Sequence, residues 1–300
     1  MPSTRELRLR VRSIKNLAQV TRALETVSAS YVRRAIQAVQ ATRPYAEKSW
    51  KVLIHLARQP GHQTLHPLLA ERQDVRKVLV VMVSGDRGLA GAYNVNILRQ
   101  TLNRFADSKI PVSYVAVGRK GRDLLIRRRK DVIADFSHLP NPPSYADVSA
   151  IGRIVVEDFQ KGLFDEVWIA FTEFVNMVDQ RPVVRKLLPL DVKYIPEGEN
   201  VGDRYNVTHH RSNAVFIYEP DQNELLNEIV PRFTAIQIYQ SILSAQASEH
   251  AARMVAMRNA TQSANELIDA LQLEYNKLRQ QLITNEMLDI SGGAEALAKG

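Results

Sequence analysis

The residues whose spacing comes nearest to a nucleotide site lie in the stretch SGDRGLAGAYN, residues 84–94. It follows the apolar run KVLVVMV, and its glycines are Gly85, Gly88 and Gly91. Glycine-rich turns that open a helix bind phosphate through backbone N–H groups. A dinucleotide site, however, needs G-x-G-x-x-G and a carboxylate ending the second strand, which here ends VAVGRKG. No Lys follows the glycines, as a phosphate loop would require. We therefore expect the glycines to serve packing and no cofactor to bind.

The basic stretch GRKGRDLLIRRRK, residues 118–130, is the second candidate for phosphate chemistry. No aromatic residue accompanies it, and single-stranded nucleic-acid sites use aromatic stacking platforms. We expect a solvated helix face with a cap, and no nucleic-acid partner.

Catalytic and metal-binding sets are not evident. The chain has no cysteine, which excludes thiolate metal sites, and the adjacent pair His209–His210 lacks helical ligand spacing. Ser84 has no nucleophile elbow around it, and Glu249–His250 is the one acid–base pair of note. Its alanine-rich helical setting predicts a surface role. We expect no catalytic, cofactor or metal site.

Two long helices are the elements that must position the functional residues of the chain. Residues 3–57 contain one proline, Pro44, and no glycine; we expect a helix there that Pro44 kinks or offsets. Its apolar positions have a mean spacing near the 3.5 residues of a coiled coil. They are Leu7, Val11, Ile14, Leu17, Val20, Leu24, Val27, Tyr31 and Ala35. A second helix is predicted from about 221 to 298, with a seam at Leu271, Tyr275, Leu278 and Leu282.

Between the helices, residues 77–190 alternate strand and helix patterns, which predicts a mainly parallel sheet flanked by helices. The pair DEVWIAFTEFVNMV and RPVVRKLLPL reads as a hairpin. The polar, turn-rich segment 191–213 is predicted to be mobile. Terminal helices of roughly 80 and 110 Å cannot fit inside so small a domain, so we expect them to pair antiparallel. Two separate oligomerising coiled coils are the alternative.

This organisation gives three segments: an N-terminal coiled-coil helix (1–58), an α/β head (75–215) and a C-terminal coiled-coil helix (221–300). Residues 1–43 carry nine Lys or Arg and two Glu, so nearly all the net charge of +8 lies there. A basic rod suits an acidic surface: nucleic acid, anionic lipid or an acidic protein collar. No apolar run is long enough to span a membrane, and no signal peptide or presequence is seen.

The end of the last helix is apolar on several sides. Its residues Leu282, Ile283, Met287, Leu288 and Ile290 cover more than one stripe, although pairing with the N-terminal helix would use one side only. Docking onto the chain's own head is one explanation. Insertion into a partner's apolar sleeve is the explanation we favour.

Three blocks resemble the gamma subunit of the F-type rotary ATP synthase. They are LRLRVRSIKNLAQVTRALETVSASYVRRA, the pair SGDRGLAGAYN with VGRKGRD, and the C-terminal stretch from ASEHAARMVAMRNATQ to SGGAEAL. The chain departs from the family's usual residues at Leu24, Gly85 and Ala90, and it lacks the cysteine-bearing insertion of chloroplast members.

The resemblance implies a Rossmann-like head and an antiparallel coiled coil that serves as central-stalk rotor. The coiled coil would lie inside the ring of alpha and beta subunits, and the head would meet epsilon and the c-ring. It implies ring contacts at Arg253, Gln280 and Thr284, with Arg22 and Leu24 near acidic loops of beta. Leu282, Ile283 and Met287 would turn in an apolar bearing.

The implied function is torque transmission driven by proton or sodium flow, with control of ATPase activity and of ion flow but no catalytic site. The implied place is the cytoplasmic face of a bacterial plasma membrane, held there through the complex. A nucleotide-responsive α/β switch and a basic nucleic-acid-binding coiled coil are the alternatives; neither explains the apolar tip.

Overall fold

The computed structural model describes residues 3–57, 66–70, 72, 74–190 and 222–298. The chain forms two compact units: residues 28–253 make one, and residues 1–27 with 254–300 make the other. We call them the α/β unit and the helix pair. The boundaries cut through both long helices, whereas the three segments expected from the sequence follow helix ends. The segment 191–213 and the pair His209–His210 lie outside the described residues.

The α/β unit is built on one five-stranded sheet with the order β3-β2-β1-β4-β5. Neighbouring strands are parallel except for β4 and β5, which form the predicted antiparallel hairpin. The mainly parallel sheet expected from the sequence is therefore confirmed. The strands are β1 (Val78–Val83), β2 (Val112–Val117), β3 (Asp131–Phe136), β4 (Glu166–Phe174) and β5 (Gln180–Leu188).

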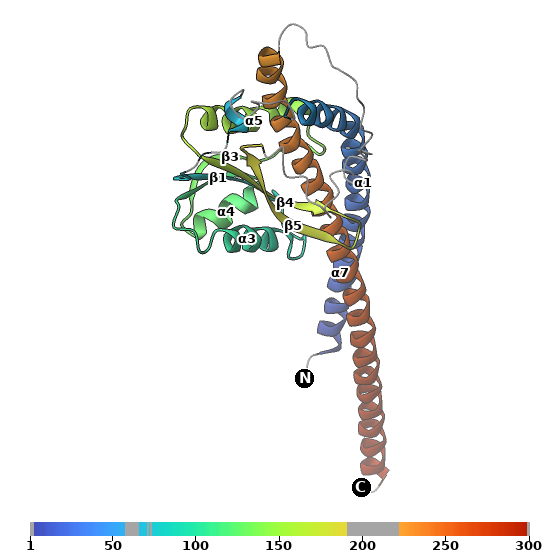
Figure 1. The fold of residues 1–300 in the computed structure, drawn as a ribbon. Coiled ribbons are helices and arrows are strands. Elements are labelled where there is room, and N and C mark those ends of the chain that lie inside the picture. The colour runs from blue at the N-terminus through green and yellow to red at the C-terminus, as the bar shows by residue number, and fades with distance from the viewer. Residues whose placement is uncertain (1–2, 58–65, 71, 73, 191–221, 299–300) are drawn as a thin grey trace. The chain divides into compact units, whose positions relative to one another are not determined.

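Helices cover both faces of the sheet (Figure 1). One face packs on α3 (Tyr93–Arg104) and α4 (Arg119–Arg127). The other packs on α5 (Tyr145–Gln160), on the short 3-10 helix η1 (Pro67–Leu69) and on residues 230–245 of the last helix. Every residue of β1 is buried, which explains its unbroken apolar sequence: a strand covered on both faces has no polar side.

The two long helices are α1 (Thr4–Ala57) and α7 (Gln222–Ala298). Pro44 and Pro231 lie inside them and end neither helix. A proline removes one backbone hydrogen bond, so the neighbouring turns and tertiary packing must compensate for its presence in a continuous helix. Length and the scarcity of glycine made both helices predictable.

In the helix pair, α1 and α7 run antiparallel, as expected. Residue numbers on α7 fall as those on α1 rise, which shows that the helices are antiparallel. They fall by nearly as many residues as those on α1 rise, so the register is constant. The contacts are Arg8 Nη2 to Tyr275 Oη at 2.8 Å, Thr21 Oγ1 to Thr261 Oγ1 at 2.7 Å, and Arg258 Nε to Glu25 Oε1 at 2.9 Å.

The predicted seam of α1 is wrong at Leu17, Val20 and Val27, whereas Leu24 and Tyr31 are half-buried and Ala35 is buried. Leu17, Val20 and Val27 are 57%, 56% and 50% exposed, whereas Ala18 and Thr21 are buried. The buried positions continue the 4-3 spacing from Leu7, Val11 and Ile14 and use small side chains, which let two helices approach closely. A mean spacing calculated over all apolar residues does not separate the two stripes of α1, one of which faces α7 while the other is exposed.

Neither long helix, nor any other helix among the described residues, is apolar enough over a sufficient length to cross a bilayer. The described residues likewise contain no cluster of three His, Cys, Asp or Glu side chains arranged to hold a metal ion.

Candidate functional site

The carboxyl edge of the sheet, where β1 lies beside β4, is where this architecture would bind a ligand. The chain passes from β1 to β2 on one side and returns later to β4 on the other, which makes this pair the topological switch point. Open α/β sheets bind ligands in the crevice at that point. The glycine loop, residues 84–92, leaves β1 there.

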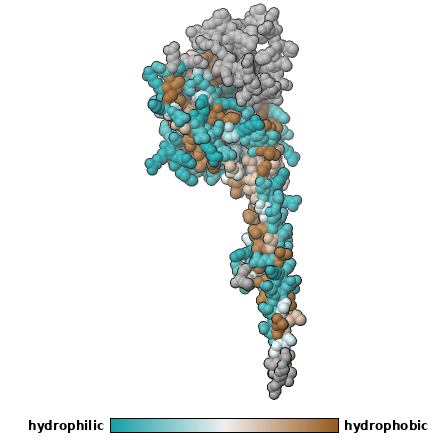
Figure 2. All heavy atoms as spheres, turned by 60° about the horizontal axis from the view of Figure 1, so that its bottom comes forward, coloured by the Kyte–Doolittle hydropathy of each residue, from teal (hydrophilic) through white to brown (hydrophobic). Residues whose placement is uncertain are grey.

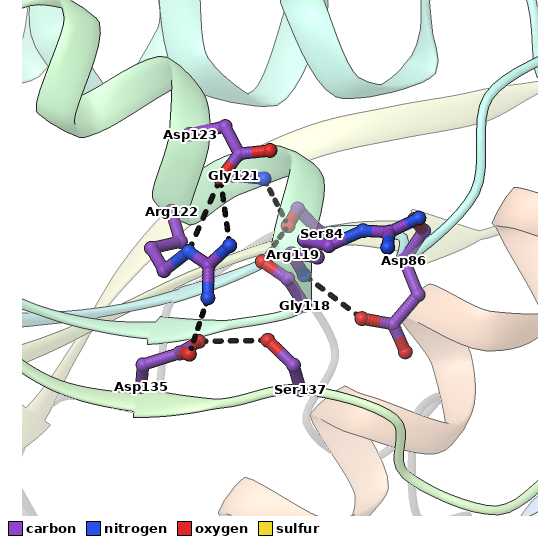
Figure 3. A network of polar contacts seen from close by, with 9 residues as sticks. All are labelled: Ser84, Asp86, Gly118, Arg119, Gly121, Arg122, Asp123, Asp135 and Ser137. Carbon is purple, nitrogen blue, oxygen red and sulfur yellow. Dashed lines mark hydrogen bonds and ion pairs between the residues drawn. The ribbon is translucent and has the colours of Figure 1, made fainter.

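Asp86 of the glycine loop caps the start of α4. Its Oδ1 accepts a hydrogen bond from the backbone N–H of Arg119 at 2.8 Å, and Oδ2 accepts from the N–H of His138 at 2.9 Å. Figure 3 shows the carboxylate facing the first turn of α4. A carboxylate at a helix N-terminus satisfies free N–H groups and is stabilised by the helix dipole. An internal anion thus takes donors that a phosphate would use.

Ser84 completes this cap. Its Oγ accepts from the N–H of Gly121 at 2.8 Å and lies within hydrogen-bonding distance of the Gly118 carbonyl oxygen (Figure 3). The carbonyl oxygen of Val117 is also within hydrogen-bonding distance, at 3.1 Å. Gly118 has φ of 97°, and a Cβ there would lie 2.3 Å from the Ser84 carbonyl oxygen. Only glycine fits that backbone conformation in that space.

Gly118 lies outside the G-x-x-G-x-x-G run for which a packing role was expected. In that run a Cβ at Gly85 would meet the Glu249 side chain. A Cβ at Gly88 or Gly91 would meet nothing within 4 Å, so close packing explains only Gly85.

Within the α/β unit, α7 lies across the ends of β1 and β4. Ser244 Oγ accepts from the N–H of Phe174 at 3.0 Å, and Ser248 Oγ donates to the carbonyl of Thr172 at 3.1 Å. Tyr93, the first residue of α3, donates its hydroxyl to the carbonyl of Ala245 at 3.0 Å. The crevice at the switch point is therefore filled by the chain's own helix.

A buried polar cluster lies on the next turns of α7. Arg253 forms an ion pair with Glu249, and its Nη1 is 3.0 Å from Nδ1 of His250. Its Nε donates to the carbonyl of Gly88 at 3.3 Å. Gly85 leaves room for this cluster, because a Cβ there would lie 2.6 Å from the Glu249 carboxylate. The ring of His250 stacks on Tyr31 of α1 with centroids 4.8 Å apart.

Burial sets the protonation of these groups. It raises the pKa of Glu249, an effect that the positive charge of Arg253 opposes. It lowers the pKa of His250 to about 4, with further lowering from Arg253 and Arg87. His250 is therefore neutral at pH 7, and because Arg253 donates to Nδ1, its proton is on Nε2. That nitrogen is buried and has no hydrogen-bond partner among the described residues.

The surface role predicted for Glu249–His250 is wrong. Glu249 is 8% exposed and His250 is 6% exposed. The alanine-rich helix gave no sign of what would cover it, because the covering groups come from the glycine loop and from α1. Sequence reasoning also missed Asp86. The signal was present, since an acidic residue three positions after the end of β1 lies at the sheet edge where α4 begins.

The other predicted site residues lie in the helix pair, except Arg253, which is buried in the α/β unit. Gln280 and Thr284 are exposed on α7, where the Thr284 hydroxyl donates to the Gln280 carbonyl at 2.9 Å. Arg22 is exposed on α1, and Leu24 is half-buried. The three predicted tip residues are all exposed: Leu282, Ile283 and Met287.

Most described polar groups of the crevice therefore bond to one another, although Thr172 Oγ1 and His250 Nε2 are buried without a hydrogen-bond partner among the described residues. In this fold the chain's own helix fills the crevice where open α/β sheets bind ligands. The chain therefore belongs to a class of α/β proteins that also form an antiparallel pair of long terminal helices.

Comparison with known proteins identifies the family within that class. A family model described as ATP synthase matches residues 3–297. The ATP synthase gamma chain of Dehalococcoides mccartyi is 44% identical, with 99% of this chain and 100% of the relative covered. The ATP synthase gamma chain of Roseiflexus castenholzii is also 44% identical, and both chains are covered in full. The chain belongs to the ATP synthase gamma chain family.

Solved structures agree on the fold. A chain from the OSCP, F1 and c-ring assembly of Euglena gracilis mitochondrial ATP synthase superposes with a TM-score of 0.66 at 19% identity, covering 98% of this chain and 94% of that chain. A chain from the central stalk and c-ring of Tetrahymena thermophila mitochondrial ATP synthase gives 0.59 at 22% identity, covering 80% and 99%.

Proposed function

We propose that this chain is the central-stalk rotor of an F-type ATP synthase, transmitting torque between a membrane c-ring and an alpha–beta hexamer. It is a non-catalytic subunit, and it controls ATPase activity and ion flow by coupling them. Its place is at the cytoplasmic face of a bacterial plasma membrane, bound through the complex. Family membership and the structural relatives support this proposal.

The uncovered end of α7 is the observation that carries it. Arg8 lies opposite Tyr275, so α1 begins opposite about residue 279 at the constant register of the pair. The helix continues to Ala298 with no α1 residue beside it. Five large apolar side chains are exposed on it, from 45% to 73%: Leu282, Ile283, Met287, Leu288 and Ile290. Figure 2 shows hydrophobic and hydrophilic surface mixed toward this end.

Exposed apolar side chains on several sides of a helix suit a sleeve that surrounds it. An apolar bearing in the hexamer would cover all of them at once. The uncovered stripe of α1 adds a second contact surface, formed by Leu17, Val20 and Val27. Arg22 is exposed on the same helix, so this surface suits a partner with apolar groups and an acidic rim.

Gln280 and Thr284 are the proposed polar contacts to the ring, with Arg22 and Leu24 near acidic loops of beta. They would hold the ring in discrete orientations because each ring state would make different contacts with them. Epsilon and the c-ring are the proposed partners of the α/β unit.

Co-expression of the chain with alpha and beta subunits tests the proposal. We expect a hexamer that contains the chain to purify, and we expect Gln280→Ala and Thr284→Ala to lower ATP-driven ion pumping per ATP hydrolysed. Both side chains are exposed, so the free energy of unfolding should change by less than about 0.5 kcal/mol. Thr26→Val, on the same helix pair, is the control. Failure of the three subunits to co-purify would contradict the rotor assignment.

A further inference from the structure

Arg253 is fully engaged inside the α/β unit. Its guanidinium contacts three groups: the Glu249 carboxylate, Nδ1 of His250 and the carbonyl of Gly88. The side chain is 9% exposed, and the Glu249 side chain is 11% exposed. Little of either charged group is left for a partner to reach.

The three contacts join separate elements. Glu249 and His250 are on α7, whereas Gly88 is in the middle of the glycine loop. His250 in turn stacks on Tyr31 of α1. Within the α/β unit, one guanidinium therefore connects α7 to the loop that follows β1 and, through His250, to α1.

The contacts require arginine chemistry. A guanidinium presents donors in a planar fork, so one side chain can serve a carboxylate, a ring nitrogen and a carbonyl at once. The ammonium of a lysine is a single point and would lose the carbonyl or the ring contact. Glu249 is the counter-ion of Arg253, which would otherwise be a buried cation without an opposite charge.

From this geometry we infer that Arg253 is a positioning residue, which locks the glycine loop onto α7 with Glu249 as its anchor. Any effect of Arg253 on a partner then passes through the loop it holds. Arg253 then acts through an internal contact and not by touching the ring of alpha and beta subunits. The test of this role by ion pumping rests on the proposed rotor function, whereas the test by hydrogen exchange does not.

The same helix offers a matched control. Glu228 and Arg232 form an ion pair at 2.6 Å with the same spacing of four residues and the same order of charges. Both side chains are 61% exposed. Exposed pairs contribute little, whereas removing one partner of a buried pair leaves an uncompensated charge.

The experiment is amide hydrogen exchange on the full-length chain for the variants Glu249→Gln, Arg253→Gln and Arg253→Lys. We expect exchange of residues 86–92 to rise on the order of hundredfold in the two glutamine variants, as loss of a buried partner implies. Arg253→Lys keeps the charge and should show a smaller rise, which keeps the test readable if Arg253→Gln does not fold. Glu228→Gln and Arg232→Gln should stay within about twofold of wild type.

Ion pumping per ATP hydrolysed is then measured in the assembled complex. We expect it to fall in Glu249→Gln and Arg253→Gln together and to remain at the wild-type value in the two controls. Unchanged loop exchange would overturn the inference. Loss of coupling in Arg253→Gln alone, with Glu249→Gln like wild type, would indicate direct ring contact and also overturn it. Failure of the wild-type chain to assemble would count against the rotor function, and the exchange result would still decide the locking role.

Discussion

The α/β unit and the helix pair are stabilised in different ways. The unit has a core of large apolar side chains on both sheet faces, with Tyr114, Phe159 and Ile151 buried almost completely. The helix pair has a narrow seam that includes Ala18, Thr21 and Ala264, and it leaves Leu17 and Met287 exposed. Apolar area removed from water is the main stabilising contribution in proteins. The helix pair leaves part of its apolar area exposed, so that area can still be buried against a partner.

Charged groups follow the same division. The α/β unit buries Glu249, His250 and Arg253 together, whereas Arg10, paired with Glu6 on α1, is 57% exposed. The two units should therefore respond differently to core substitutions and to pH. Trp168 of β4 belongs to the α/β unit and provides a fluorescence probe of it, while far-UV circular dichroism is dominated by the long helices.

The largest effect is expected from Phe159→Ala. The ring lies in the core between α5 and the sheet, with the Arg72 guanidinium 4.8 Å from its centroid. Removing it should cost about 3–5 kcal/mol of unfolding free energy through lost burial and a cavity. Denaturant titration followed by tryptophan fluorescence measures this. Leu163→Ala, at a position that is 50% exposed, should cost far less. Equal costs for the two variants would contradict the assigned core.

A smaller effect is expected from pH. His250 has a pKa of about 4 in the folded chain and 6.5 as its ordinary value. As pH falls, the unfolded chain takes up the proton first, so the stability from neutral His250 is complete above about pH 6.5 and is lost as pH falls toward 4. The shift corresponds to about 3 kcal/mol. The raised pKa of Glu249 acts with the opposite sign.

Comparison of wild type with His250→Gln isolates this contribution, because Glu249 titrates in both proteins. Fluorescence-detected stability at pH 7 and pH 4 should show a larger acid loss in wild type. A parallel pH dependence in the two proteins would show that His250 is not buried and neutral.

The smallest effect is expected in the helix pair, at Thr21 and Thr261. Each hydroxyl also lies within hydrogen-bonding distance of a carbonyl oxygen of its own helix, Ala18 O at 3.0 Å and Met257 O at 2.9 Å. Because each hydroxyl has one hydrogen, one threonine donates across the pair while the other donates to its own carbonyl. Thr21→Val and Thr261→Val should each cost about 1 kcal/mol, and the double variant should cost at least about 0.5 kcal/mol less than the two together. Circular dichroism during denaturation measures the cycle. The exposed Thr26, whose hydroxyl donates to Arg22 O within its own helix, is the control. Strict additivity would mean that the hydroxyls do not interact.

Much of the fold could be predicted because the signals are local. The buried strand KVLVVMV and the hairpin strands are predicted by their apolar and β-branched runs, and the long helices by the scarcity of glycine.

The seam of α7 was predictable at Leu271, Tyr275 and Leu278, which are half-buried in a helix that is otherwise exposed there. The fourth predicted seam residue, Leu282, was wrong: it is 46% exposed, because α1 does not extend that far. The α1 seam was predictable at Leu7, Val11 and Ile14 but not at Ala18 and Thr21, whose small or polar side chains give little apolar signal.

The sequence by itself determined which segments are strands and helices, because period, length and helix breakers act over a few neighbouring residues. It also excluded a standard nucleotide fingerprint from the spacing of Gly85, Gly88 and Gly91. Only the tertiary structure decided that α7 fills the switch point, that Asp86 caps α4, and that Arg253 turns inward. These contacts join residues far apart in the chain, and their burial depends on which elements meet, a property that no short stretch of sequence contains.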